Sequence, residues 1–178
     1  MFDDVELSEA QILLKGAEAL NALQAALAIG RVAVSAQLTG IAKGCLEQTV
    51  TYVNQRVQFG RPIGSFQSIK HRCVDLLIEV ELADACWREA ARQLDSDEQD
   101  CIASVCAAKA RSSDVARKVG KEAVQMHGAM GFTEECDVGL FLRAALQLSG
   151  WLGSPHSMRR QFLTVTESNL LHAEVANG

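Results

Sequence analysis

The scarcity of helix-breaking residues constrains this chain more than any other feature of its sequence. Its 178 residues include two prolines, Pro62 and Pro155. Proline removes a backbone donor and clashes with the preceding helical turn, so the long proline-free stretches can form uninterrupted helices. Alanine, leucine, glutamate, glutamine and arginine are plentiful, and these residues favour helix over sheet. The sequence therefore predicts an all-α fold.

Apolar periodicity and loop signals divide the chain into three long helices followed by two shorter ones. The expected helices cover residues 19–55, 66–94, 96–126, 135–148 and 155–171. Ser154 before Pro155 is typical of an N-cap followed by proline at the first helical position. Short connections between successive helices predict an up-and-down bundle. We expect one helical domain at 17–172, with a lead-in segment at 1–16 and a tail at 173–178.

Charge and cysteine spacing exclude several classes of protein. The net charge is −5 with no basic stripe, which argues against a nucleic-acid partner. No run of 18 uncharged apolar residues exists, so we expect no membrane span. The acidic start has no apolar region of a signal peptide. The six cysteines form no CxxC pair and no zinc-ligand spacing, so we expect reduced thiols, no metal site and a cytoplasmic protein.

Two loop segments are more specific than composition can explain. The first is RVQFGRPIGSFQ at residues 56–67, and the second is QMHGAMGFTEE at residues 125–135. At this separation, and on a helical frame, they resemble the C-terminal domain of acyl-CoA dehydrogenases. The resemblance extends over about residues 17–165.

The resemblance implies a fold, a chemistry and a set of partners. Members of that family are flavoproteins that oxidise an acyl-CoA thioester across Cα–Cβ. A glutamate removes the α-proton while FAD accepts a hydride from the β-carbon, and an electron-transfer flavoprotein-type acceptor is implied. Their C-terminal domains pack together in an oligomer, where each reaches across to the FAD of its neighbour.

The same two segments supply the side chains that the resemblance assigns to FAD. They are Arg56, Gln58, Phe59, Ile63, Phe66, Gln67, Gln125, Gly128 and Ala129. An arginine offers a bidentate donor fork to a pyrophosphate, glutamines suit phosphate or adenine edges, and glycine lets backbone N–H groups approach closely. Ala129 stands where the family commonly has glycine. Two alternatives stay open: Arg56 could pair with a carboxylate of the bundle, and the phenylalanines could anchor the loop to the core.

The catalytic base is the point at which this sequence departs from the resemblance. Most members place their glutamate in a loop before the last helix, where this chain has Leu152. A minority place it on the first long helix before an arginine, where this chain has Gly30 followed by Arg31. Neither residue can accept a proton, so we expect no catalytic residue in this chain. The resemblance places Arg31 near the substrate thioester, and a structural ion pair is its alternative role.

Three functions remain open at this stage. The chain could be a base-lacking domain or small subunit that pairs with an unlike catalytic subunit, as in heteromeric acyl-CoA dehydrogenases. It could be an active enzyme whose base has moved to Glu134, Glu135 or Asp137. It could also be a helical assembly module that kept the fold without the cofactor.

Overall fold

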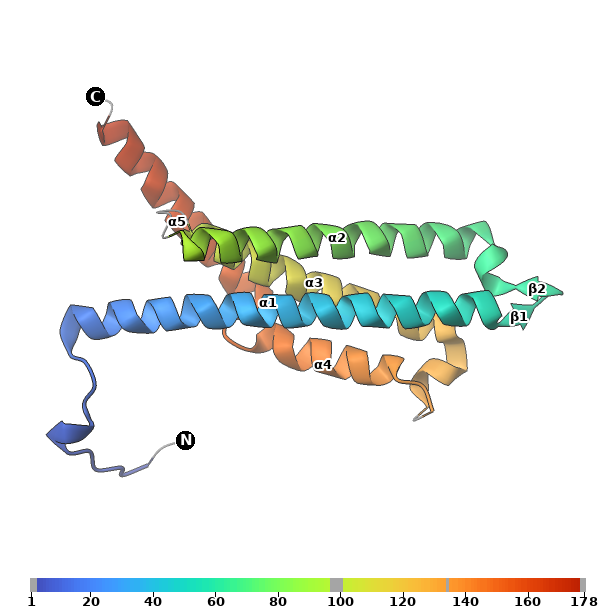
Figure 1. Ribbon diagram of the computed structural model, residues 1–178, viewed down its shortest axis with the longest axis horizontal. Coiled ribbons are helices and arrows are strands. Elements are labelled where there is room, and N and C mark those ends of the chain that lie inside the picture. The colour runs from blue at the N-terminus through green and yellow to red at the C-terminus, as the bar shows by residue number, and fades with distance from the viewer. Residues whose placement is uncertain (1–2, 97–100, 134, 177–178) are drawn as a thin grey trace.

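One long helix, α1 (Gly16–Gln55), runs through the length of the molecule and organises the rest of the fold (Figure 1). Its 40 residues correspond to about 60 Å at 1.5 Å per residue. The computed structural model describes residues 3–96, 101–133 and 135–176. The other α-helices are α2 (Gln67–Asp95), α3 (Cys101–His127), α4 (Val138–Gly150) and α5 (Pro155–Ala176).

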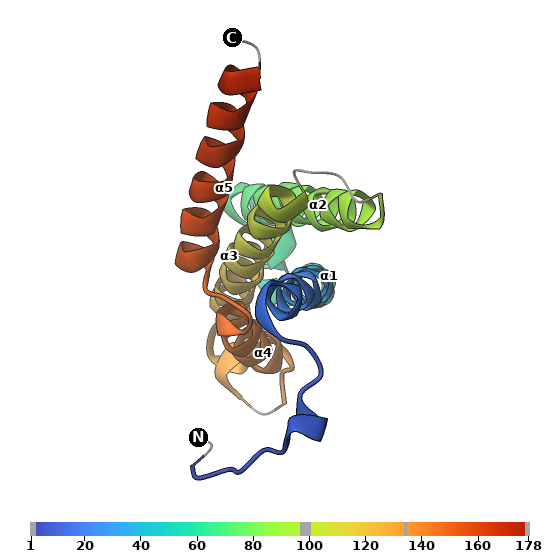
Figure 2. The same ribbon diagram turned by 90° about the vertical axis from the view of Figure 1, so that its left-hand side faces the viewer.

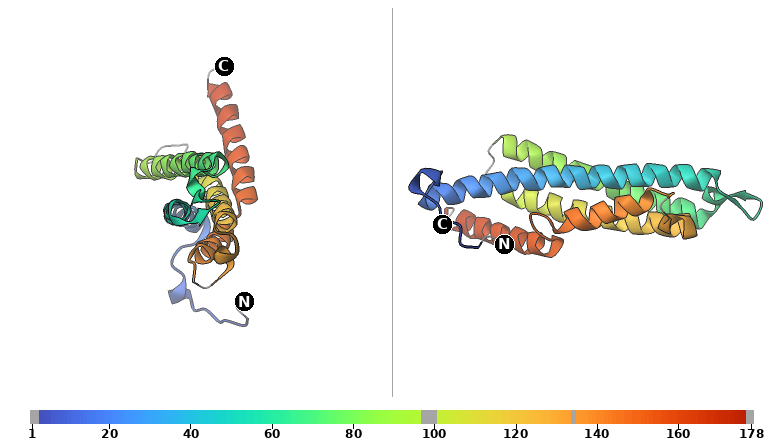
Figure 3. Two further views of the ribbon diagram at one scale, coloured as in Figure 1. Left: turned by 90° about the vertical axis from the view of Figure 1, so that its right-hand side faces the viewer. Right: turned by 90° about the horizontal axis from the view of Figure 1, so that it is seen from below.

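The first four α-helices alternate in direction along one common axis, as an up-and-down bundle requires (Figures 1 and 3). α3 lies at the centre and packs against each of the other α-helices. The last helix, α5, leaves the bundle axis and projects to one side (Figure 2). The predicted all-α bundle is therefore confirmed, with α5 packed on α3 near its start and free of the bundle towards its end.

A β-hairpin at one end of the bundle was not expected from the sequence. Strands β1 (Val57–Gln58) and β2 (Arg61–Pro62) pair antiparallel. The turn residues Phe59 and Gly60 have φ angles of 56° and 78°, which is typical of the two-residue turns that join tight hairpins. Strands of two residues carry no periodicity, so the sequence indicated only an ordered loop.

The boundaries of several helices differ from expectation. α4 begins at Val138, because a 3-10 helix, η3 (Gly128–Phe132), and an irregular segment precede it. α5 continues to Ala176, five residues beyond the expected end. A further 3-10 helix, η2 (Ile63–Ser65), leads into α2, and η1 (Glu9–Gln11) lies in the lead-in segment. The Ser154 hydroxyl accepts the Ser157 N–H at 3.2 Å, which confirms the predicted N-cap of α5.

Buried side chains of α1, α2, α3 and α4 form the main apolar cluster, and smaller clusters join α1, α2 and α3 and join α3 to α5. Buried hydroxyls interrupt it without leaving unpaired donors, because Ser35, Thr39 and Thr49 donate to carbonyls one helical turn back at 2.7–2.9 Å. All six cysteines are free thiols. Burial, with Cys136 nearby, raises the pKa of Cys45 to about 12, so this thiol stays protonated and unreactive at neutral pH.

α1 is long and apolar enough to cross a membrane by length and composition alone, whereas the sequence predicted no membrane span. Of its most apolar window, 39% is buried inside the structure. A helix that packs one face in the core of a bundle passes the same test, so one such helix is weak evidence for a span.

Truncation of the core should destabilise the protein in proportion to burial. Leu76 is 2% exposed within the central cluster. We expect Leu76→Ala to lower the free energy of unfolding by about 3 kcal/mol, because it removes buried methyl groups and leaves a cavity. Leu163→Ala, at a position 57% exposed on α5, is the control and should cost under about 1 kcal/mol. Urea denaturation measures both, and equal losses would contradict the assigned core.

Candidate functional site

The two sequence-predicted cofactor segments lie at the same end of the bundle. The first forms the hairpin and η2 that follow α1, and the second forms the end of α3 and η3 (Figures 1 and 3). The Tyr52 hydroxyl, one turn before the end of α1, lies 3.4 Å from the carbonyl oxygen of His127, the last residue of α3. The helical frame thus brings together segments that are far apart in the sequence.

Most polar side chains of the predicted set are exposed and uncommitted. Within the described part of the chain, no hydrogen bond or ion pair involves the side chains of Arg56, Gln58, Gln67 and Gln125. The alternative role of Arg56 was an ion pair with a carboxylate of the bundle. No such carboxylate partner is present among the residues that the structure describes. The unpaired donors are free to bind an anionic or polar ligand.

The aromatic and aliphatic members of the first segment divide into two groups. Phe59, at the hairpin tip, is 90% exposed. Phe66 is half-buried; its ring meets Phe59 edge-on at 6.1 Å, and the Arg61 guanidinium lies 4.1 Å above its centroid. Ile63 packs against the core cluster. Ile63 and Phe66 therefore anchor the loop, whereas Phe59 presents a free apolar ring.

Glycines of the second segment leave the backbone open to a ligand. Gly128 has a φ of +60°, and a Cβ there would meet nothing within 4 Å. Ala129, beside it, is exposed, so its methyl group points into open space rather than into the bundle. Gly131 is required for packing, because a Cβ would lie 2.8 Å from the Val124 carbonyl oxygen.

The two positions expected for a catalytic base lie against each other. A Cβ placed on Gly30 would lie 2.8 Å from Cδ1 of Leu152, although 121 residues separate Arg31 from Leu152 in the chain. Leu152 has a φ of +57°, a left-handed conformation that is unusual for a leucine and marks a constrained turn. Both positions are therefore filled by non-ionisable groups in contact.

Arg31 supports this turn and forms no ion pair with the residues that the structure describes. Its Nε donates to the Leu152 carbonyl oxygen at 2.9 Å, and its Nη1 donates to Gln161 Oε1 at 3.1 Å. The guanidinium is half-buried, and these bonds orient it across the start of α5. Arg31 and Leu152 are thus joined through the backbone of the turn.

A buried lysine holds the same turn from the other side. Lys109 is 0% exposed, and its Nζ donates to the carbonyl oxygens of Leu148, Ser149 and Gly153 at 3.1–3.2 Å and to Ser113 Oγ at 3.0 Å. It satisfies the last carbonyls of α4, which have no partner inside their own helix. Burial, and then the nearby Arg31 charge, lowers the pKa of Lys109 to about 8.

Sequence reasoning missed Lys109 and the Tyr52–His127 contact. The sequence signal for Lys109 was a charged residue amid the small residues of the third helix. Such a position is expected to be buried, and lysine is rarely buried without partners. Among the residues that the structure describes, no three His, Cys, Asp or Glu side chains are grouped so that they could hold a metal ion.

Comparisons with known proteins agree with this geometry. A family model described as "Acyl-CoA dehydrogenase, C-terminal domain" matches residues 20–165. An acyl-CoA dehydrogenase of Bacillus subtilis is 37% identical over 145 residues, which cover 82% of this chain and 38% of that protein. FadE34 of Mycobacterium tuberculosis is 35% identical over 138 residues, which cover 77% of this chain and 19% of FadE34. The solved structure of butyryl-CoA dehydrogenase from Megasphaera elsdenii matches with a TM-score of 0.74 at 36% identity, covering 82% of this chain and 37% of that one.

The chain therefore belongs to the acyl-CoA dehydrogenase family, as its C-terminal helical domain. Members of this family are FAD-dependent. The chain spans less than two fifths of the length of each of these three relatives.

Removing the buried ammonium group should be costly. We expect Lys109→Met to lower the free energy of unfolding by about 2–4 kcal/mol, because it leaves buried carbonyl oxygens without donors. Lys118→Met is the matched control, since Lys118 is half-exposed and its ion pair with Glu79 lies at the surface, and it should cost under about 1 kcal/mol. Chemical denaturation measures both; a Lys109→Met variant as stable as the wild type would contradict the clamp.

The stability difference between the wild type and Lys109→Met should depend on pH. The pKa of Lys109 falls from 10.5 to about 8 on folding, so between these values the unfolded chain binds this proton more tightly than the folded chain. The free energy of unfolding of the wild type therefore rises as pH increases from about 8 to 10.5, because deprotonation removes the desolvation penalty of the buried ammonium group, and this titration adds nothing below about pH 8. Unfolding curves should show the wild-type advantage growing between pH 8 and 10. A constant difference would refute the lowered pKa.

Proposed function

We propose that this domain contacts the FAD of a neighbouring subunit in an acyl-CoA dehydrogenase assembly and contributes no catalytic base. One observation carries the proposal: the two candidate base positions, Gly30 and Leu152, are in mutual contact and neither can accept a proton. Proton abstraction in the assembly then falls to an unlike subunit of the same family.

The uncommitted donors at the hairpin end fit a dinucleotide. The Arg56 guanidinium would bind the pyrophosphate, and the Gln58 and Gln125 amides would bind neighbouring polar edges. The open backbone at Gly128 admits close approach of a phosphate or ribose. When bound, FAD supplies the hydride acceptor for desaturation of the thioester.

The distance between the two regions supports contact with the neighbour's cofactor. Arg56 directly follows the helix that carries Gly30, and their separation of 26 positions corresponds to about 39 Å at 1.5 Å per residue. This exceeds the length of an extended dinucleotide. The hairpin end and the Leu152 turn therefore face different FAD molecules, so the hairpin end serves a second subunit.

A relocated base in this chain has little support. Asp137 and Glu135 precede α4, whereas Leu152 follows it, and the 13 residues of α4 correspond to about 20 Å. Both carboxylates thus lie far from the turn at which Arg31 and Leu152 meet. Glu134, the third candidate, lies outside the described residues.

The length of one relative supports a partnership between two subunits. Matches of similar length cover 19% of FadE34 and 38% of the Bacillus subtilis enzyme, so FadE34 is about twice as long. That length is sufficient for two chains of this family joined in one. We accordingly propose an unlike catalytic subunit as the partner, with an acyl-CoA substrate and an electron-transfer flavoprotein-type acceptor for the cytoplasmic assembly.

An exposed apolar face on α1 and α2 supports the assembly of subunits. The face is a groove of about 410 Å³. Its apolar lining residues include Leu46 and Val50 of α1 and Leu77 of α2. The exposed residues Ile78 and Leu82 extend it along α2. Monomeric soluble proteins rarely expose apolar patches this continuous.

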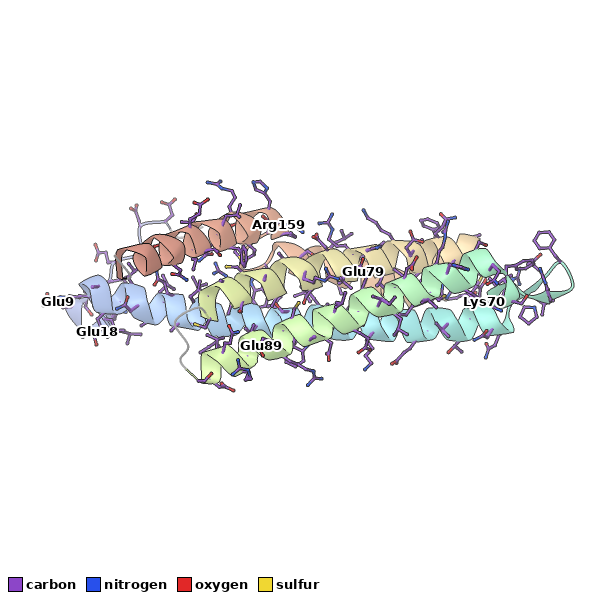
Figure 4. The ribbon with its side chains drawn as sticks, turned by 90° about the horizontal axis from the view of Figure 1, so that it is seen from above. Glu9, Glu18, Lys70, Glu79, Glu89 and Arg159 are labelled. Atoms are coloured by element: carbon purple, nitrogen blue, oxygen red, sulfur yellow. The ribbon has the colours of Figure 1, made fainter. Side chains whose placement is uncertain are left out.

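The charged residues that line this groove favour a second subunit of the same fold as its occupant. They are Lys43 and Glu47 on α1 and Glu81 on α2. A lining that carries both signs can pair with the matching face of a subunit of the same fold. Figure 4 shows the charged side chains of α2, including Lys70, Glu79 and Glu89, spread along its length.

Flavin retention separates a cofactor-contacting role from a purely structural assembly module. In the assembled flavoprotein, Arg56→Gln should weaken FAD binding about tenfold or more, because it removes a charge-assisted bond worth about 1.5–3 kcal/mol. Arg61→Gln, in the same hairpin but stacked on Phe66, is the matched control and should retain FAD. Flavin fluorescence titration measures both. Unchanged affinity in Arg56→Gln would leave only the structural role.

A charge placed on the apolar face should dissociate the assembly. We expect Leu77→Asp to shift the protein to smaller species in sedimentation, because an interface cannot bury an unpaired carboxylate. Leu163→Asp is the control: Leu163 is similarly exposed, at 57%, but lies on α5. Loss of assembly in both variants, or in neither, would contradict the assigned face.

A further inference from the structure

We propose that Tyr52 and His127 are positioning residues that couple the two cofactor-contacting segments, so that the order of one segment depends on the other. Their rings stack with centroids 4.1 Å apart and planes inclined by 21°. This inference rests on the proposed function for its purpose, although the coupling itself is a property of this chain alone.

On the α1 side, Tyr52 is tied directly to the hairpin. Its carbonyl oxygen accepts the Arg56 N–H at 2.8 Å, in the last turn of the helix. The Arg56 carbonyl oxygen in turn accepts the Ile63 N–H at 2.8 Å, which closes the hairpin back onto the helix end. The Tyr52 ring is half-buried, so its position follows the core rather than the solvent.

On the α3 side, His127 fixes the start of the glycine-containing segment. It is 4% exposed, and its Nδ1 lies 2.8 Å from the Ala123 carbonyl oxygen. A carbonyl oxygen only accepts, so Nδ1 carries the proton and donates. The next residue is Gly128, whose left-handed φ directs the chain away from the helix. The imidazole ring is therefore held at the point where the second segment begins.

The stack is a direct bridge between these two helix ends. The Tyr52 hydroxyl donates to the His127 carbonyl oxygen at 3.4 Å, so ring and hydroxyl contact the same residue. That carbonyl belongs to the last turn of α3, where helical carbonyls lack partners within their own helix. Movement of either helix end breaks the stack, so the distance between Arg56 and Gly128 is fixed by this pair.

Coupling of this kind is measurable as hydrogen exchange in one segment after a change in the other. Tyr52→Leu should speed exchange of the amides of residues 128–132 by roughly threefold to tenfold, the loss expected for one aromatic pair. His127→Leu should speed exchange of the amides of residues 57–61 in return, because coupling is reciprocal. Amides of the α3 core at Val115 and Val119 should be unchanged in both variants.

Two control variants separate positioning from general destabilisation. Tyr52→Phe keeps the stacked ring and should restore most of the protection, even though it lacks the hydroxyl. Trp87→Leu truncates a half-buried aromatic residue near the other end of α2 and should leave both segments unchanged. Faster exchange only at the mutated helix end, or equally throughout the chain, would overturn the proposed coupling.

A second measurement distinguishes failure of the coupling from failure of the proposed function. In the assembled flavoprotein, Tyr52→Leu should weaken FAD binding several-fold, whereas Trp87→Leu should leave FAD binding unchanged. If exchange is coupled but Tyr52→Leu and Arg56→Gln both keep full FAD affinity, the coupling is retained and the flavin role is rejected. Weaker FAD binding in Arg56→Gln alone, without coupled exchange, would retain the flavin role and reject the coupling.

Discussion

The buried ammonium group of Lys109 is the interaction on which the geometry of the candidate base position depends. It bonds to the last carbonyl oxygens of α4 and to Gly153 in the following turn. A buried charge is tolerated only when it is fully bonded, so the turn cannot move without exposing an unpaired cation. Leu152 sits within this turn in a left-handed conformation, and its side chain is thereby fixed over Gly30.

The bundle carries two distant regions on one rigid frame. One end holds uncommitted donors on a hairpin and a glycine turn, and the other region holds an aliphatic contact where the resemblance expects a base. α1 extends through both regions and is packed along much of its length by α2, α3 and α4. A continuous helix keeps the separation constant, which suits a domain that serves the cofactor of a neighbouring subunit.

The sequence predicted the helices because their signals are local. Long stretches without proline, the Ser154–Pro155 pair and the glycine-containing loops each act within a few residues. The two segments that carry the family resemblance were recognisable because they are contiguous strings. Their common location at one end of the bundle followed from the alternation of the helices.

The remaining features depend on contacts between residues that are distant in the sequence. Lys109 bonds to carbonyls about 40 residues away, and Tyr52 meets His127 across a separation of 75 residues. No local pattern marks such partners. The hairpin was missed for a different reason, since strands of two residues show no alternation of apolar and polar positions. The sequence left open whether Phe66 contacts the cofactor or anchors the loop, and its ring contacts with Phe59 and Arg61 are visible only in three dimensions.

The central claim is that this domain brings no base to acyl-CoA oxidation. The most direct test uses a flavoprotein assembly in which this domain is the only kind of C-terminal domain. An acyl-CoA is mixed with that assembly without oxygen, and the visible absorbance of the flavin is measured. The account predicts no flavin bleaching in the wild type and measurable bleaching in Leu152→Glu, which places a carboxylate over Gly30. Full bleaching of the flavin in the wild-type assembly, abolished by Glu135→Gln or Asp137→Asn, would contradict the claim that this domain supplies no base.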